Sequence, residues 1–521
     1  MDDILLNTSQ LQLPFLAAFT GTHSAPDQIN DTALFGDIFS ATALETAFKE
    51  EFASTTGKGI DRLNGFQFAT NANALLATAS AKCLTGAYRF SPFLEVLKTK
   101  GRDKNPRLIG IPTVRDRVVL HQLNKFLAAL YPERVPRNVA STFVREISTD
   151  LMGKSPTETW ICSTDIKTFY DSIQRDRLLK ILAKRIKSKS ALKLIGHALA
   201  TPTVPKNTRK AKHSDYRTDI GVPQGLAISN ILASIYMQEV DDIMPTLGIT
   251  YYRYVDDVLM YGAHDVVQKA FVSLRARLKL RGLSLHPIGS GKSHLQPLSK
   301  PFGYLGYTFE WPLISVREST TERFLQSIAA KFSDYTHNKS RRLERFKYLT
   351  PERLKEIFIL ELNERITGAI SQKKRYGWIA YFNQISDLQL LHHLDNAIEG
   401  MFKRLPDFGG KAPSDLKRLR RAYFEMKFNP QGGYVRDYDK ITTGAEMLAF
   451  LTERGRVGPE EALTDEQIKD RYEKYLQHIL AAMHKDEGTL YGSNMRAVDA
   501  YRASDTLQDS GSAGGSALYP A

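Results

Sequence analysis

This chain of 521 residues contains only two cysteines, Cys83 and Cys162. They form no CxxC pair and no histidine cluster of zinc spacing accompanies them, so neither a disulfide framework nor structural zinc is indicated. We therefore expect a chain that works in a reducing cytoplasm. No apolar run reaches transmembrane length, and the opening MDDILLNTSQ is acidic where a signal peptide is basic, which predicts no membrane role.

Acidic residues are outnumbered, with 71 Lys and Arg against 57 Asp and Glu and a formal net charge of +14. Such an excess predicts a polyanionic partner. Basic tracts lie at 207–213, 338–347 and 417–423 (KRLRRAY). Each alone is typical of a solvated face, but together with the interleaved aromatic residues they predict a channel for RNA or a primer and template duplex.

Two adjacent aspartates interrupt an aromatic and β-branched run at 251–262, YYRYVDDVLMYG. The pattern predicts a strand at 251–255, a tight turn carrying Asp256 and Asp257, and a second strand at 258–262. Carboxylates this close repel each other unless cations lie between them, and Mg²⁺ suits such hard oxygen ligands. A solvated hairpin turn also accommodates aspartate, which is the structural alternative.

Two further segments supply partners for this hairpin. In WICSTDIKTFYDSI (160–173) an apolar strand ends at Asp165, an amphipathic helix is expected from near Ser172, and Asp171 is assigned as its cap. In GVPQGLAISNILASIYM (221–237) a turn opens onto an apolar helix. Gly225 allows close approach of the backbone to a ligand, and Gln224 offers an amide to a sugar or base; an ordinary capped loop is the alternative.

In this order the three segments resemble motifs A, B and C of reverse transcriptases. YRF (88–90) and IPTVRDRVV (111–119) resemble the fingers segment of the bacterial branch, RGLSLHP (281–287) resembles the motif D region, and FGYLGYTF (302–309) resembles the primer grip. The resemblance implies an α+β fold: right-hand fingers and palm with an antiparallel sheet and helices, followed by an all-α thumb-like and C-terminal region. Its implied segments are 1–80 (N-terminal helical lead), 81–315 (fingers and palm), 316–485 (helical thumb-like extension) and 486–521 (flexible tail).

The same resemblance implies roles for individual residues. Asp165, Asp256 and Asp257 would hold two Mg²⁺ ions about 3.5 to 4 Å apart, which activate the primer hydroxyl and brace the triphosphate. Lys292 would stand near the pyrophosphate as a proton donor, although an exposed loop lysine is the commoner case. The primer grip would be formed by Tyr304, Leu305 and Gly306.

The remaining implied residues contact the incoming dNTP. Lys100 and Arg107 would bind its triphosphate, with a solvated basic hairpin as the alternative. Tyr170, five positions after Asp165, would lie beneath the sugar and exclude a 2′-hydroxyl, unless it is simply a core aromatic residue. Gln224 and Gly225 complete this set.

The C-terminal part is similar to that of one subfamily. Helices are expected at 323–346, 354–374 and 377–405, as a thumb or as a packing and oligomerisation scaffold. The segments 375–395 and 428–439 resemble the C-terminal extension of abortive-infection and other defence-associated bacterial reverse transcriptases. Nothing after motif E resembles an HNH endonuclease, a group II DNA-binding region or an RNase H set, which disfavours a retron or group II intron role.

This resemblance implies a polymerase of antiphage defence with dNTPs, an RNA template, a DNA product and a homo-oligomeric assembly. Some abortive-infection relatives begin DNA synthesis on a protein hydroxyl. Tyr519, in the Gly- and Ser-rich tail, is the candidate priming residue, with Tyr491 and Tyr501 as rivals and a plain disordered tail as the alternative. The function from another class that we keep open is a non-catalytic RNA-binding scaffold.

Overall fold

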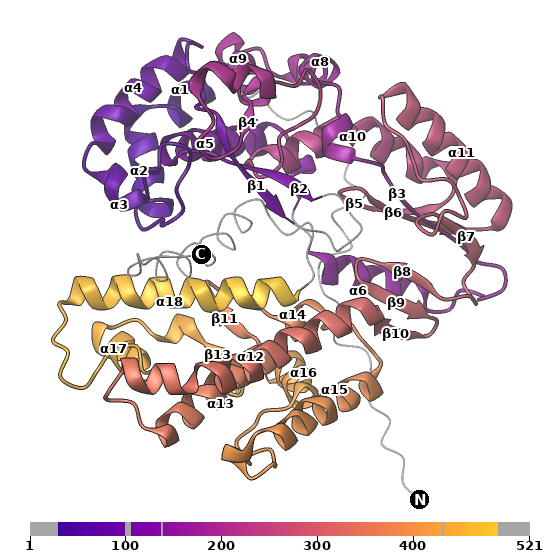
Figure 1. Cartoon of the computed structure of the whole chain (residues 1–521). Coiled ribbons are helices and arrows are strands. Elements are labelled where there is room, and N and C mark those ends of the chain that lie inside the picture. The colour runs from indigo at the N-terminus through magenta and orange to yellow at the C-terminus, as the bar shows by residue number, and fades with distance from the viewer. Residues whose placement is uncertain (1–29, 99–105, 137–138, 430, 488–521) are drawn as a thin grey trace, which may run out of the picture.

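The structure is a computed structural model and describes residues 30–98, 106–136, 139–429 and 431–487 (Figure 1). Most elements from α1 to α11 fill one half of the molecule, and those from α12 to α18 fill the other. Helix α6 (Ala140–Leu151) connects the two, because its buried face belongs to a hydrophobic cluster that contains Ile161 and Leu259 of the first half and many residues of the second. The chain is therefore interlocked across the two halves.

From residue 30 on, four helices precede the first described strand: α1 (Asp31–Ile38), α2 (Ala41–Glu51), α3 (Gly65–Ala69) and α4 (Ala72–Leu84). The side chains of Ser40 and Asn64 accept hydrogen bonds from the first turns of α2 and α3 and so fix where these helices begin. Their apolar faces pack on α5 (Val114–Leu130) within one large core. The predicted N-terminal lead thus shares its core with the fingers and palm.

An antiparallel sheet of four strands, in the order β5-β6-β3-β7, lies at the centre of the first half. Its strands are β3 (Trp160–Asp165), β5 (Thr250–Tyr254), β6 (Asp257–Gly262) and β7 (His294–Pro297). Helix α11 (His264–Leu280) packs on β3 and β6. The predicted hairpin is confirmed with one correction: Val255 and Asp256 form the turn, and Asp257 is already the first residue of β6.

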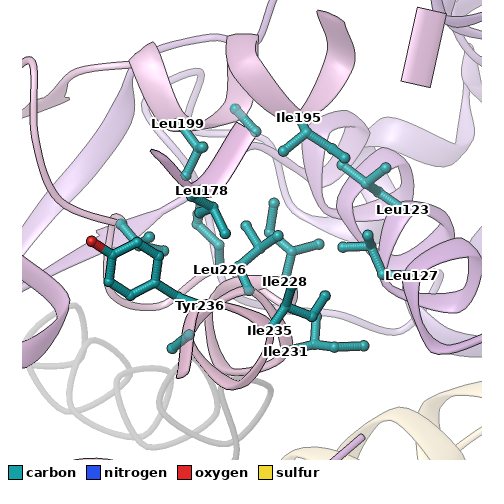
Figure 2. Close-up of a cluster of buried hydrophobic side chains, with 14 of the residues drawn as sticks. Leu123, Leu127, Leu178, Ile195, Leu199, Leu226, Ile228, Ile231, Ile235 and Tyr236 are labelled. Carbon is teal, nitrogen blue, oxygen red and sulfur yellow. The ribbon is translucent and has the colours of Figure 1, made fainter. Parts of the chain in front are cut away.

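A helical layer of the first half is held by aliphatic side chains. Figure 2 shows Leu123 and Leu127 meeting Ile195 and Ile228 in the middle of this layer. The helices involved are α5, α8 (Arg175–Arg185), α9 (Lys189–Ala200) and α10 (Ser229–Ile243). The PQG loop, residues 221–228, enters the same core through Leu226 and Ile228, so its position is set by packing.

The capping role assigned to Asp171 is wrong. A one-turn helix, α7 (Phe169–Ser172), contains Asp171, and α8 begins only at Arg175 with Gln174 at its cap position. The carboxylate of Asp171 instead accepts a hydrogen bond of 3.2 Å from the Gln224 side chain. This partner lies far along the chain, so local sequence spacing gave no sign of it.

The segment predicted as fingers contains a small sheet in the order β2-β1-β4, formed by β1 (Phe93–Lys98), β2 (Arg107–Ile111) and β4 (Thr203–Val204). A second small sheet, β10-β9-β8, consists of β8 (Phe302–Tyr304), β9 (Tyr307–Glu310) and β10 (Leu313–Val316). Strand β8 adjoins β3, so this sheet continues the palm toward the helical half.

The second half is mainly helical, as predicted, but two of the expected helices are divided. Its helices are α12 (Glu318–Arg345), α13 (Pro351–Thr367), α14 (Trp378–Tyr381), α15 (Leu388–Met401), α16 (Leu419–Phe428), α17 (Gly444–Glu453) and α18 (Asp465–Asp486). The segment 354–374 leaves the helix at Gly368 and enters β11 (Ala369–Ser371) and β12 (Lys374–Tyr376). With β13 (Arg436–Asp437) they form a three-stranded sheet.

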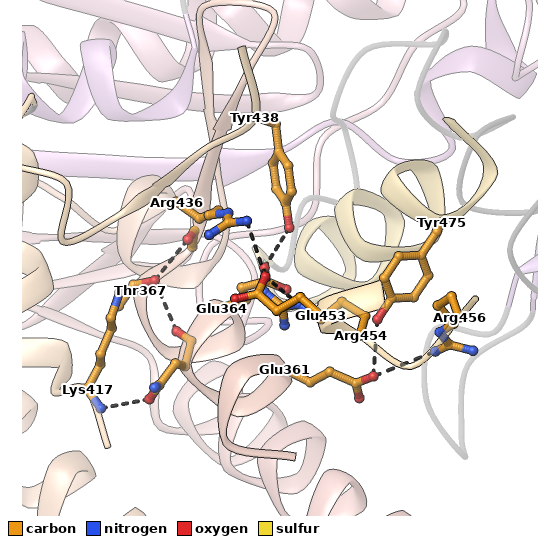
Figure 3. A network of polar contacts seen from close by, with 12 residues as sticks. Glu361, Glu364, Thr367, Lys417, Arg436, Tyr438, Glu453, Arg454, Arg456 and Tyr475 are labelled. Carbon is orange, nitrogen blue, oxygen red and sulfur yellow. Dashed lines mark hydrogen bonds and ion pairs between the residues drawn. The ribbon is translucent and has the colours of Figure 1, made fainter. Parts of the chain in front are cut away.

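Buried charges join α13 to the C-terminal helices (Figure 3). Glu364 accepts hydrogen bonds from Arg454 at 2.6 Å and from the Tyr438 hydroxyl at 2.8 Å, and all three side chains are buried. Glu361 accepts from the Tyr475 hydroxyl of α18 at 3.1 Å. Because unpaired buried charges are costly, this network fixes α17 and α18 on α13.

The fold class is the predicted one: an α+β half built around an antiparallel sheet, followed by a largely helical half. Three hydrophobic clusters stabilise it, and they do not follow the predicted segment boundaries. Across the described residues, none of the helices combines the length and the apolar character that a membrane crossing requires.

Candidate active site

Asp165 and Asp257 face each other at the end of the central sheet. Asp165 is the last residue of β3 and Asp257 the first of β6, and the two are direct partners in the antiparallel register. Beyond this pair the backbone NH of Ile166 donates to the carbonyl of Asp256 at 3.0 Å. The strands therefore bring two of the three predicted aspartates together and hold the third in the adjoining turn.

The turn that carries Asp256 is strained and clamped from behind. Val255 has a φ of +60°, a conformation that is costly for a β-branched residue. The buried guanidinium of Arg253 donates to the Val255 carbonyl at 2.7 Å and makes a two-pronged contact with Asp241 of α10. The Tyr251 hydroxyl also donates to Asp241, at 3.1 Å. The sequence did not predict this clamp, because the strand pattern at 251–255 gives no indication that Arg253 binds Asp241 and the Val255 carbonyl.

A lysine and a histidine stand on one side of the carboxylate pair. Lys292 places its Nζ 2.8 Å from Asp165 Oδ2, and His286 places its Nε2 3.5 Å from the same oxygen. Lys292 is half exposed, so its ammonium is able to leave this contact for another anion. Lys292, predicted to stand near the pyrophosphate as a proton donor, lies beside Asp165, and that role remains a prediction; His286, which was not predicted, accompanies it.

The pair carries electrostatic strain. Burial, and next the facing charge of Asp165, raise the pKa of Asp257 to about 6, while Arg317 and Lys292 oppose the shift. Within the described residues no group of three or more His, Cys, Asp or Glu side chains is gathered closely enough to hold a metal ion. The three aspartates thus form an opposed pair with a neighbour, in a site where a cation would relieve repulsion.

The PQG loop is bound to the fingers strand β2. The backbone NH of Gly110 donates to the Gln224 carbonyl at 2.8 Å, and the Gln224 amide is held by Asp171. Gly225 has a φ of +101°, and a Cβ there would lie 2.7 Å from the Gly110 carbonyl oxygen and from Ile109. Gly225 was predicted to let the backbone approach a ligand; its close neighbour in the structure is the backbone of β2, and its contact with a dNTP remains a prediction.

Gly225→Ala should destabilise the protein by about 3 kcal/mol and loosen the loop, because it adds both backbone strain and a clash. Gly289→Ala is the matched control, since its φ is +84° but nothing lies within 4 Å of the added Cβ. That variant should lose only about 1 kcal/mol. Urea unfolding of both variants measures the difference, and equal losses would mean that the contact with β2 contributes nothing.

Tyr170 is held by a residue of α10. Its hydroxyl donates a short hydrogen bond to Oδ1 of Asn230, in the first turn of α10. Burial, and next the charge of Asp256, raise the pKa of Tyr170, which keeps the hydroxyl protonated. Arg107 of β2 opposes this shift and so lies within electrostatic range of the ring. Tyr170, Arg107 and the aspartates therefore surround one region.

Two predicted assignments, Lys100 and the primer grip, remain predictions. Lys100 lies outside the described residues. In the β8–β9 hairpin Tyr304 and Leu305 are buried, and the carbonyls of Leu305 and Gly306 already accept from the Tyr381 hydroxyl at 3.3 Å and the Arg317 backbone at 3.1 Å. The primer-grip role of this hairpin remains a prediction.

Residues 97–309 match the family model described as reverse transcriptase (RNA-dependent DNA polymerase). Curated relatives include an uncharacterized 91 kDa protein in the cob intron of Schizosaccharomyces pombe, 32% identical over 31% of this chain and 20% of its own length. The group II intron-encoded protein LtrA of Lactococcus lactis subsp. cremoris is 25% identical over 40% of this chain and 34% of its own. The chain thus spans a fifth to a third of the length of these two relatives.

Among solved structures, the apo telomerase of Candida tropicalis is 12% identical, with a TM-score of 0.39 over 83% of this chain and 74% of that chain. The sequence match is the more informative comparison, because the matched residues contain β3, the PQG loop, the β5–β6 hairpin and the β8–β9 hairpin. The chain therefore carries a reverse transcriptase domain over this segment.

Proposed function

We propose that this chain is an RNA-directed DNA polymerase that extends a 3′-hydroxyl with deoxynucleotides. The observation that carries the proposal is the register pairing of Asp165 with Asp257, with Asp256 in the adjoining turn. The family match over residues 97–309 supports it. A purely structural role would gain nothing from two carboxylates facing each other at the end of a sheet.

The proposed cofactor is a pair of Mg²⁺ ions held by Asp165, Asp256 and Asp257. The residues fit the ion, since they offer hard oxygen ligands and their mutual repulsion, which contributes to the raised pKa of Asp257, is relieved by a cation. When bound, two such ions activate the primer hydroxyl and neutralise the leaving pyrophosphate.

The chain's own side chains have separable tasks in this proposal. Before substrate arrives, Lys292 holds the Asp165 carboxylate through its hydrogen bond. Its half-exposed ammonium then binds the triphosphate and neutralises part of its charge. Phosphoryl transfer depends mainly on such positioning and charge neutralisation. Arg107 supplies a second cation from the fingers side.

Asn230→Ala is expected to lower the preference for dNTPs over ribonucleotides by roughly tenfold, because the Tyr170 ring loses the bond that fixes its position. Tyr170→Ala, which removes the ring, should lower it by roughly 100-fold. The measurement is the ratio of kcat/KM for dCTP and CTP on one primer and template. Tyr170→Phe should lower the preference as much as Asn230→Ala does, and the double variant Tyr170→Phe/Asn230→Ala should lower it no further, since both changes remove the same bond. Equal losses of kcat/KM for dCTP and CTP would contradict this role.

The polymerase proposal is tested by incubating purified protein, with the RNA that copurifies, with Mg²⁺ and each labelled dNTP. Products are then treated separately with protease, DNase and RNase. DNase-sensitive label that disappears after RNase pretreatment of the enzyme is the expected result. No incorporation with any nucleotide, on copurified RNA or on a supplied primer and template, would overturn the proposal and favour the RNA-binding scaffold.

We further propose that this DNA synthesis serves bacterial antiphage defence through abortive infection. The support is the resemblance of segments 375–395 and 428–439 to the extension of defence-associated enzymes. Cells carrying the Asp256→Asn/Asp257→Asn variant should lose protection in a phage plating assay while the protein still folds and binds RNA. Unchanged protection by that variant would favour the scaffold.

We also propose that a tyrosine following α18, with Tyr519 as the first candidate, primes synthesis. Tyr519 lies outside the described residues, but the last described residue, Glu487, is bound at 3.1 Å by the backbone NH of Gly377. Burial is the main cause of the raised pKa of Tyr381, and the charges of Glu487 and Asp257 add to it, so α18 ends within electrostatic range of the site's surroundings. Undiminished self-labelling of Tyr519→Phe by radioactive dNTP would exclude this residue and leave Tyr491 and Tyr501.

A further inference from the structure

An open groove lies along α15 and α16, in the helical half and apart from the aspartates. Its volume is about 1660 Å³, larger than the range of roughly 300 to 1,000 Å³ that is typical of small-molecule sites. The basic tract 417–423 forms part of its wall. A groove of this size and openness suits a polymer more than a compact ligand.

Four cationic side chains line the groove: Lys417, Arg418, Arg420 and Arg421. Arg418 and Arg421 pair with Glu399 at 3.0 Å and Glu425 at 3.3 Å. Arg420 is exposed, and within the described chain its guanidinium makes no hydrogen bond or ion pair, although its backbone NH donates to Asp395. It is a cation available to an incoming phosphate.

Aromatic rings stand beside these cations. Phe424 and Phe428, one turn apart on α16, are 41% and 76% exposed, and their rings stack with centroids 6.2 Å apart. The ring of Tyr434, another lining residue, has its centroid 4.5 Å from Arg421 Cζ and 4.9 Å from Lys417 Nζ. Two large exposed rings next to free positive charge form a platform on which bases stack while arginine meets the backbone.

Resting on the proposed polymerase function, we propose that this groove binds a single-stranded segment of the RNA that the enzyme copies. The groove also contains Glu399, Asp415 and Glu425, which disfavour phosphates but accept hydrogen bonds from a 2′-hydroxyl, a donor that DNA lacks. One lining residue, Leu388, directly follows Ser386 and Asp387, which bond to β10 of the small sheet next to the central one. This contact joins the segment that lines the groove to the half that holds the aspartates.

The test is fluorescence anisotropy of a labelled 12-nucleotide oligo(U) and the matched oligo(dT) with the full-length chain, in EDTA. Phe428→Ala should weaken RNA binding by roughly tenfold without changing its salt dependence, since it removes stacking alone. Arg420→Ala should weaken it similarly and reduce the slope of log K against log salt by about 0.7. Both side chains are exposed, so neither change threatens the fold.

Phe66→Ala and Arg217→Ala are matched controls, an exposed ring and an exposed arginine outside the groove, and should leave binding unchanged. Equal losses in the controls, or no loss in the groove variants, would overturn the assignment. Equal binding of oligo(dT) and oligo(U), with equal losses, would overturn the assignment to RNA. Because the assay involves no synthesis, the two failures are distinguishable: an inactive enzyme that binds RNA through the groove would refute the polymerase proposal, and with it the statement that this RNA is copied, while the groove would still be an RNA-binding site.

Discussion

Asp257→Asn is expected to reduce DNA synthesis by at least about 1000-fold, because the variant loses a ligand charge where metal ions must neutralise the triphosphate. The amide preserves the shape of the side chain at the first position of β6, so the register with Asp165 should remain. The measurement is single-turnover incorporation of labelled dNTP at saturating Mg²⁺. An activity within tenfold of the wild type would contradict the assignment of Asp257 as a metal ligand.

The same change should stabilise the protein when no metal is present. The pKa of Asp257 is about 6 in the folded chain and about 4 when unfolded, so stability falls as the pH rises from about 4 to about 6 and the unfolded carboxyl ionises first. The amide of asparagine does not ionise, so the variant does not lose stability as the pH rises. We expect the variant to gain on the order of 2 kcal/mol at pH 7.5 in EDTA, and little at pH 4.

Thermal unfolding with and without Mg²⁺ checks both statements at once. Mg²⁺ should raise the Tm of the wild type more than that of Asp257→Asn, since binding to the folded state stabilises it. Asp265→Asn is the control, an exposed aspartate that pairs with Lys269 on α11, and should respond to Mg²⁺ as the wild type does. A variant that is less stable than the wild type in EDTA at pH 7.5 would refute the electrostatic strain at this pair.

The central sheet and its two facing aspartates were predictable, because they depend on strands whose apolar runs end at Asp165 and begin after Asp256. Asp171 was misassigned because its partner, Gln224, comes from a loop 53 residues away. Local spacing predicts helices and turns well, but it carries no information about which distant side chain satisfies a carboxylate.

The division of the C-terminal helices has the same cause. The segment 354–374 keeps a helical pattern, yet Gly368 has a φ of +69° and a Cβ there would lie 2.1 Å from the Tyr376 carbonyl, so only a glycine fits where the chain turns into β11. In 377–405 the chain breaks where Ser386 and Asp387 bond to β10. Tertiary contacts overrode the local periodicity at both places.

The residue that sequence reasoning missed most plainly is Arg253, and Arg253→Met should reduce activity by about 10- to 100-fold through poorer Mg²⁺ binding. The guanidinium fixes the Val255 carbonyl at 2.7 Å, and without it the strained turn no longer holds Asp256 beside the facing pair. The free energy of unfolding should fall by about 3 kcal/mol, because Asp241 loses its buried partner. The measurements are the Mg²⁺ concentration for half-maximal synthesis and urea unfolding.

A double variant separates positioning from stability. Arg253→Met/Asp241→Leu removes both charges, so it should regain most of the lost stability while its Mg²⁺ requirement stays raised, since the Val255 carbonyl still lacks its donor. Arg134→Met is the control: Arg134 pairs with the neighbouring Asp242 at 2.7 Å, but that carboxylate is 58% exposed, and both readouts should stay near wild type. Recovery of the normal Mg²⁺ requirement in the double variant would show that Arg253 only balances Asp241. A Mg²⁺ requirement that stays raised would show that metal binding depends on the bond from Arg253 to the Val255 carbonyl. Stability would then depend on the separate ion pair of the same guanidinium with Asp241.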